Sequence, residues 1–153
     1  MRWATRNVDA PSTFAARPED PGMFYQWNRK IGWSATDPMI NSNGGTVWDS
    51  SMATGMTWEK ANDPSPVGWR LPTVEEQNKL RDNDKVNRVT TYQNGIYGLK
   101  ITDKENGNSI FLPAAGWRNG LGGFLDYAGS FGGYCSSTTY TGDDIYNGVH
   151  EMF

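Results

Sequence analysis

Alternation of apolar and polar residues predicts a β-hairpin in the second half of the chain. Residues 96–103 (IYGLKITD) alternate as a strand with one buried face does, and residues 109–114 (SIFLPA) form a second run. The KENG sequence between them contains Asn-Gly, a strong signal for a tight turn. Because Ile96 and Leu99 do not keep strict parity, we expect a β-bulge near Gly98.

The spacing of polar and apolar residues also predicts one helix, whose first residue is better defined than its last. Thr73 and Glu76 have the spacing of a capping box, and Pro72 holds the preceding backbone extended. The helical face continues to about Asp84. Residues 23–31 (MFYQWNRKI) have aromatic and aliphatic residues spaced by three and four, which fits either a short helix or an aromatic strand.

The remaining sequence predicts strands joined by long loops. Residues 2–9 (RWATRNVD) alternate and predict a first strand with one solvated face, whereas residues 10–21 contain three prolines and predict a loop. Residues 34–57 lack periodicity and predict an ordered loop held by Trp33, Trp48 and Trp58. Two further strands are predicted at 134–137 and 145–153. Strands outnumber helices, so we expect an α+β fold with a twisted antiparallel sheet.

Composition narrows the class of protein further. The chain has 153 residues, enough for one domain with a substantial core, and a formal net charge of -3. An acidic balance gives no reason to expect a nucleic-acid partner. No apolar run reaches membrane-spanning length, and the polar start predicts no signal peptide. The 18 glycines and 7 tryptophans favour short strands with aromatic residues between them.

Candidate chemistry is sparse. Cys135 and His150 are the only cysteine and histidine; the favoured interpretation of Cys135 is a buried small hydrophobe, with a Cys/His pair or a metal site as weak alternatives. Asp143 and Asp144 suit a solvated turn better than a calcium site. The carboxylates of Glu75, Glu76, Asp82 and Asp84 suit a solvated helix face better than glycoside hydrolysis. No cofactor is expected.

The last quarter of the chain, residues 116–153, has the composition of a recognition surface. Glycine, serine, threonine and asparagine alternate there with aromatic residues; lysine is absent, and Arg118 is the one strong cation. Rigid aromatic rings supply contact area at low entropic cost, and small polar residues supply adaptable hydrogen bonds. The alternative is a Gly-rich β core, with the same rings facing inward.

Several strings resemble one known family. GWRLPT at 68–73 resembles a segment of C-type lectin-like folds, both of the formylglycine-generating-enzyme type and of the Fibrobacter succinogenes major paralogous domain family. The second is favoured by strings at 3–8 (WATRNV), 25–28 (YQWN), 112–116 (LPAAG) and 134–137 (YCSS), which match in order along nearly the whole chain. Within it, the chain is similar to variable proteins of diversity-generating retroelements. The resemblance implies one C-type lectin-like domain with one or two short helices and long ordered loops.

The resemblance also implies which residues bind ligand. Variable-type positions carried over from the family are Asn119, Leu121, Phe124, Asp126, Tyr127, Phe131, Thr138, Tyr140, Asp143, Asp144, Tyr146 and Asn147. Scaffold positions are Gly116, Trp117, Gly129, Ser130, Tyr134, Ser136 and Ser137. The implied function is non-catalytic recognition of a protein or glycan on a cell surface, in a phage tail or a bacterial surface protein. The alternatives are a structural module without a ligand and a divergent enzyme.

Two departures from the family are visible. Relatives have Trp where this chain has Cys135, and they continue past the strand equivalent to 145–153, whereas this sequence ends at Phe153. Three explanations of this second departure stay open: the sequence is a piece of a longer one, the closing strand comes from elsewhere, or the scaffold is a shorter version of the family's. The paired cysteines of formylglycine-generating enzymes and the calcium-binding strings of true C-type lectins do not occur in it.

Overall fold

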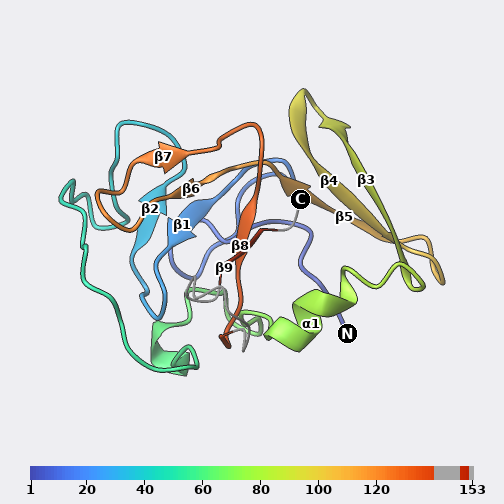
Figure 1. The fold of residues 1–153 in the computed structure, drawn as a ribbon, viewed down its shortest axis with the longest axis horizontal. Helices are drawn as coiled ribbons and strands as arrows, with labels where there is room; N and C mark the ends of the chain where they lie inside the picture. Colours follow the sequence, from blue (N-terminus) through green and yellow to red (C-terminus); the bar gives the residue numbers. More distant parts are fainter. Residues whose placement is uncertain (140–148, 152–153) are drawn as a thin grey trace.

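The computed structural model describes residues 1–139 and 149–151, the latter by their backbone. Within that part the fold is α+β but mainly β, with short antiparallel strands and little helix (Figure 1). None of the described helices is long and apolar enough to cross a membrane. The elements are β1 (Met23–Tyr25), β2 (Gly32–Ser34), η1 (Lys60–Asn62), α1 (Val74–Lys79), β3 (Val86–Gln93), β4 (Ile96–Asp103), β5 (Ser109–Pro113), β6 (Trp117–Arg118), β7 (Leu125–Asp126), β8 (Gly133–Cys135) and β9 (Val149–Glu151).

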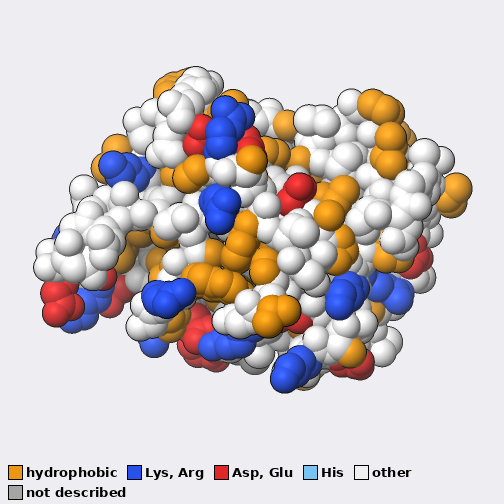
Figure 2. Space-filling model, turned by 180° about the vertical axis from the view of Figure 1, so that it is seen from behind, with side chains coloured by type: hydrophobic (Ala, Val, Ile, Leu, Met, Phe, Trp, Pro, Cys, Tyr) orange, Lys and Arg blue, Asp and Glu red, His pale blue; other side chains and the backbone are white. Residues whose placement is uncertain are grey.

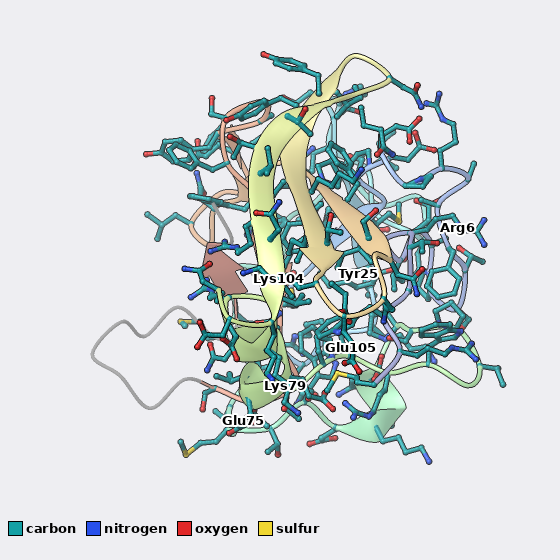
Figure 3. The ribbon with its side chains drawn as sticks, turned by 90° about the vertical axis from the view of Figure 1, so that its right-hand side faces the viewer. Arg6, Tyr25, Glu75, Lys79, Lys104 and Glu105 are labelled. Carbon is teal, nitrogen blue, oxygen red and sulfur yellow. The ribbon has the colours of Figure 1, made fainter. Side chains whose placement is uncertain are left out.

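The largest sheet is the antiparallel meander β3-β4-β5, which confirms the predicted hairpin and adds a strand. β3 and β4 are joined at Asn94 and Gly95, whose φ angles of 48° and 80° are those of the type I′ turn that suits a two-residue hairpin. The inner face of the sheet buries Val86, Leu99 and Ile101 against Leu80, the residue that caps α1. Figure 3 shows the hairpin at the front, with α1 near its lower end.

The predicted bulge near Gly98 is wrong. Every residue of β4 from Gly98 to Thr102 pairs with one residue of β5, and the ladder to β3 is equally regular. Leu99 and Ile101 lie on the buried face of β4. Ile96 is the first residue of the strand and is 42% exposed, so the break in alternation between Ile96 and Leu99 reflects the start of the strand. Glycine is needed at position 98 for another reason: a Cβ atom there would lie 2.6 Å from the ring of Phe111.

A buried carboxylate holds the tip of the β3–β4 hairpin. Glu19 is 2% exposed and accepts hydrogen bonds from the side chains of Asn94, at 2.6 Å, and Gln93, at 3.2 Å. The bond from Asn94 is the main cause that lowers the pKa of the Glu19 carboxyl. The predicted loop at 10–21 therefore positions a hairpin more than seventy residues further along the chain.

Three other boundaries differ from those the sequence predicts. The predicted first strand at 2–9 is wrong, because only Val8 forms a bridge, to Phe14. The ambiguous residues 23–31 form no helix; β1 pairs instead with β2, which begins at Gly32. The helix predicted to reach Asp84 ends at Lys79. It ends early because Asp82 receives hydrogen bonds from the backbone of the following turn, which leads directly into β3.

The GWRLPT segment is a junction in which the side chains of Arg70 and Thr73 both have structural partners. The predicted capping box is confirmed: Thr73 Oγ1 accepts from the Glu76 amide, and the Glu76 carboxylate accepts from the Thr73 amide. Arg70 donates two hydrogen bonds to the same carboxylate, at 2.7 and 2.8 Å. Trp69 packs edge-on against Phe14, with ring centroids 5.6 Å apart. The interpretation of this string as a fold-building element is therefore consistent with its contacts.

Replacing Glu76 by glutamine is expected to lower the free energy of unfolding by about 1–2 kcal/mol at pH 7, because it weakens a cap and an ion pair together. Hydrogen bonding from Arg70 lowers the pKa of Glu76 to about 2, from an ordinary value of 4.5. The carboxylate's stabilisation is thus fully present above about pH 4.5 and is lost as the pH falls towards 2. Urea unfolding at several pH values measures this.

Glu75→Gln is the matched control, since it removes the same charge from the adjacent, exposed position of α1 (Figure 3). We expect the Glu76→Gln protein to lose part of the acid sensitivity that wild type shows between pH 4.5 and 2, and Glu75→Gln to keep it. Equal pH profiles for the two variants would contradict the proposed role of the Glu76 carboxylate.

Candidate functional site

The first half of the predicted recognition segment forms two successive tight turns. The strands β6 and β7 pair and enclose residues 119–124, and a second turn, 127–131, follows directly (Figure 1). Gly116 donates its amide to Phe131 O at 2.8 Å, which closes the base of both turns. The exposed apolar side chains that these turns carry, here called the aromatic surface, are Leu121 (94% exposed), Phe124 (71%), Tyr127 (56%) and Phe131 (37%).

The 119–124 turn is closed by Asn119. Its backbone both donates and accepts a hydrogen bond across the turn. Asn119 N donates to Phe124 O at 2.9 Å, and Asn119 O accepts from Gly123 N at 3.0 Å. Its side-chain oxygen accepts from Gly122 N at 3.1 Å, and its side-chain nitrogen donates to Asp126 at 3.2 Å. Asn119 and Asp126, two of the predicted ligand-binding positions, therefore contact each other and shape the turn that presents Leu121 and Phe124.

The 127–131 turn depends on a backbone conformation that tyrosine seldom adopts. Tyr127 has φ 59°, in the left-handed region, which costs a residue with a Cβ atom about 1–2 kcal/mol. Its carbonyl accepts the amides of Ser130 and Phe131, at 3.0 and 3.1 Å. Its ring lies between those of Trp117, at 4.8 Å, and Phe131, at 5.5 Å. Trp117, a predicted scaffold residue, thus packs against the exposed ring of Tyr127.

Arg118 connects the aromatic surface to a distant loop. Its side chain is 1% exposed, and its guanidinium donates hydrogen bonds to the carbonyl oxygens of Ser34 (2.9 Å), Thr36 (2.8 Å) and Gly123 (2.8 Å). It also forms a 3.2 Å ion pair with Asp37, whose side chain is 71% exposed. This role of Arg118 was not predicted from the sequence, although a lone strong cation in a Gly/aromatic segment was a signal for it.

A second contact to the same loop comes from Trp48. Its indole nitrogen donates to Gly120 O at 3.2 Å, and its ring lies 4.9 Å from that of Trp33. Gly123 rests on this ring: a Cβ atom at that position would come within 2.6 Å of Trp48 and 2.7 Å of Met39. The predicted pinning of the 34–57 loop by tryptophans is confirmed for Trp33 and Trp48.

The structure separates Thr138 from the other predicted ligand-binding residues. Its hydroxyl accepts the Val74 amide at 3.1 Å, and its backbone forms a bridge with Thr57. It therefore lies beside the start of α1 and follows β8 in the chain. The remaining predicted positions lie outside the described residues: Tyr140, Asp143, Asp144, Tyr146 and Asn147.

Predicted scaffold residues in β8 and after it are tied to the body of the fold. Tyr134 donates its hydroxyl to Pro113 O at 2.8 Å, and burial raises its pKa. Ser136 is 0% exposed and donates to Thr138 O. Ser137 N donates to Pro72 O at 2.7 Å, which joins this segment to GWRLPT.

Cys135 has the environment of a structural thiol. It donates through Sγ to Tyr25 O at 3.6 Å, and burial raises the pKa of its thiol to about 12. At neutral pH the nucleophilic thiolate is therefore scarce. The side chain of His150, its candidate partner, lies outside the described residues. Among those that are described, no three His, Cys, Asp or Glu side chains gather as metal ligands do.

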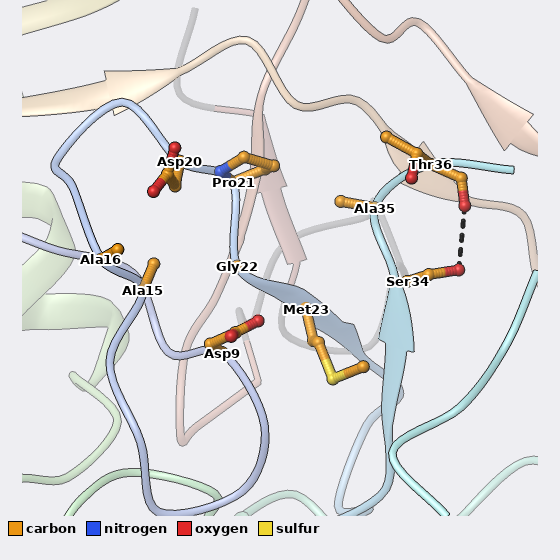
Figure 4. A pocket seen from close by; sticks show the side chains of 10 residues that line it. All are labelled: Asp9, Ala15, Ala16, Asp20, Pro21, Gly22, Met23, Ser34, Ala35 and Thr36. Carbon is orange, nitrogen blue, oxygen red and sulfur yellow. Dashed lines mark hydrogen bonds between the residues drawn. The ribbon is translucent and has the colours of Figure 1, made fainter. Parts of the chain in front are cut away.

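A hollow of about 410 Å³ lies between residues 9–23 and 34–36 (Figure 4). Its wall includes the carboxylates of Asp9 and Asp20 beside small and apolar side chains such as Ala15 and Met23. Asp20 is already paired with Arg17 at 2.8 Å, which lowers the pKa of the Asp20 carboxyl. The lining residues include no histidine, cysteine or lysine, and the Ser34 hydroxyl at the wall donates to Thr36 O at 2.9 Å.

No family model matches the chain, and neither the curated proteins nor the solved structures contain a match to it. The resemblance to the C-type lectin-like family therefore stays a prediction, carried by the sequence strings alone.

Substituting Arg118 by methionine is expected to lower the free energy of unfolding by about 2–4 kcal/mol, since three carbonyl oxygens lose a charged donor in a buried setting. Asp37→Asn keeps those three bonds and removes only an exposed charge, so its expected cost is at most about 1 kcal/mol. Guanidinium unfolding of both proteins measures the difference. Similar losses in the two variants would show that the ion pair, rather than the carbonyl bonds, carries the stabilisation.

Proposed function

We propose that this chain is a non-catalytic recognition domain with a C-type lectin-like fold, which binds its ligand through the aromatic surface. The observation that carries the proposal is the exposure of Leu121 and Phe124, 94% and 71%, at the tip of a turn closed by hydrogen bonds. An inward-facing Gly-rich core, the alternative that the sequence left open, would bury these side chains.

The energetics of the two turns support the proposal. Exposed apolar groups gain nothing from folding, and clusters of them on a protein surface mark interaction sites. Tyr127 adds a strained backbone to this: such strain persists only where the surrounding contacts enforce it, and strained residues cluster at functional sites. Because the turns are already ordered, ligand binding would pay little additional conformational entropy.

Aromatic anchors of this kind dominate the binding energy of protein interfaces. A few central aromatic residues commonly account for most of the affinity, surrounded by contacts that mainly exclude water. Here Phe124, Tyr127 and Phe131 are the anchors, and Trp117 is their support. Asn119 and Asp126 fix the shape of the surface.

The proposed setting is a phage tail or a bacterial surface protein, with a ligand on a cell surface. This part rests on the sequence strings that resemble variable proteins of diversity-generating retroelements, such as residues 68–73 and 134–137. In that setting the two turns would be the diversified part of the surface, and Arg118 with Trp117 the constant support beneath it.

The test is binding of the biotinylated chain to a panel of intact bacteria, followed by flow cytometry. For a strain that binds, the triple variant Leu121→Ser/Phe124→Ser/Tyr127→Ser is expected to bind at least about tenfold more weakly, because the anchors are gone. Its melting temperature is expected to change by only about 2–4 °C, since surface substitutions have small effects on stability.

The matched control is Val67→Ser/Tyr92→Ser, which removes two side chains that are 97% and 70% exposed elsewhere on the molecule. This control is expected to bind like wild type. Undiminished binding by the triple variant would contradict the proposed role of the aromatic surface, and equal losses in both proteins would indicate non-specific adhesion by exposed apolar groups.

A further inference from the structure

A second group of exposed apolar side chains lies on the loop that supports the aromatic surface. Within residues 39–48, Val47 is 84% exposed and Ile40 is 41% exposed, and Met39 and Trp48 are half-buried beside them. This loop lies some seventy residues before the turns, and the sequence analysis assigned it only a structural role. At the upper right of Figure 2, apolar side chains gather at the end of the molecule that carries β2, β6 and β7.

We propose that the ligand-binding surface continues over residues 39–48 and that its ligand is a folded protein presenting apolar side chains, rather than a saccharide. This inference rests on the proposed function, because it extends the same surface. It adds Ile40 and Val47 as contact residues from a second segment, and it chooses between the two ligand classes that the sequence allowed.

The two segments form one unit. Trp48 donates to Gly120 O at 3.2 Å, inside the turn that carries Leu121. The same ring, together with Met39, packs against Gly123, immediately before Phe124. The neighbouring residues of the loop are fixed by Arg118, which binds the carbonyl oxygens of Ser34 and Thr36 on one side and of Gly123 on the other.

The order of the loop is further set by its own hydrogen bonds. Ser34 N donates to Ile40 O at 2.9 Å, and Ile40 N donates to Ser34 Oγ at 3.1 Å. The backbone of Ile40 is thus fixed on both sides while its side chain stays partly exposed. A ligand that covers Phe124 would therefore meet a neighbouring loop that is ordered before binding.

The chemistry of this combined surface favours a protein ligand. A saccharide presents hydroxyl groups, and burying them without hydrogen-bond partners is costly. Several polar groups near the tip are already used: two hydrogen bonds hold the side chain of Asn119, Asp126 accepts one of them, and the Arg118 side chain is 1% exposed. The exposed side chains of Leu121 and Val47 are aliphatic, and apolar residues fill the cores of protein–protein interfaces.

The test selects folded binders and maps where they bind. A phage-displayed library of randomised three-helix domains is selected on the biotinylated full chain, and the recovered domains are titrated against three variants. These are Phe124→Ser, Ile40→Ser/Val47→Ser and the distant control Val67→Ser. The wild-type chain is also applied to a glycan array.

We expect both the Phe124→Ser and the Ile40→Ser/Val47→Ser proteins to bind the selected domains at least about tenfold more weakly, with a change below about twofold for Val67→Ser. Losses confined to Phe124→Ser would overturn the two-segment surface and leave the proposed function intact. Selected domains unaffected by Phe124→Ser would count against the proposed function itself. An array saccharide that binds wild type but not Phe124→Ser would overturn the choice of a protein ligand alone.

Discussion

A guanidinium that is withdrawn from water needs hydrogen-bond acceptors, and Arg118 finds them in its own turn and in a loop 82 to 84 positions earlier in the chain. On one side it binds the carbonyl oxygens of Ser34 and Thr36, and on the other that of Gly123. Trp48 makes a second connection between the same two segments, through its hydrogen bond to Gly120 O. Regular secondary structure contributes little to holding the 119–124 turn, because β6 and β7 are only two residues long each. The geometry of the exposed turns depends on this one buried charge.

The polar and apolar residues of the turns have separate tasks. Asn119 and Asp126 bond to each other and to the backbone, so their polarity stabilises a shape. The exposed side chains are apolar or aromatic and do not hold the turns together by hydrogen bonds; they are those of Leu121, Phe124 and Tyr127. A surface built in this way can exchange its exposed side chains at small cost to the fold. That property is what a recognition domain with variable contact residues requires, and it is the physical basis for the function proposed above.

Local signals in the sequence were sufficient for some elements. The capping box of Thr73 and Glu76 and the β4–β5 hairpin were predicted because each depends on neighbouring residues. β3 was not predicted, since only Val86 of its eight residues is fully buried and its sequence therefore lacks a periodic apolar pattern. The composition of residues 116–153 favoured exposed aromatic rings but left a Gly-rich core open as the alternative. It did not indicate that Asn119 closes a turn or that Arg118 reaches Ser34, because those roles depend on partners brought together only by the tertiary fold.

The central claim is that the aromatic side chains are displayed on turns that are ordered before any ligand binds. Hydrogen exchange of individual amides, followed by NMR, tests it most directly at Asn119, Gly122 and Gly123, whose N–H groups are all bonded within the turn. In the free protein we expect these amides to exchange much more slowly than those of an unstructured peptide. We also expect Arg118→Met to remove this protection while the amides of β4 keep theirs. Exchange at unstructured rates in the wild-type turn, with β4 still protected, would contradict it.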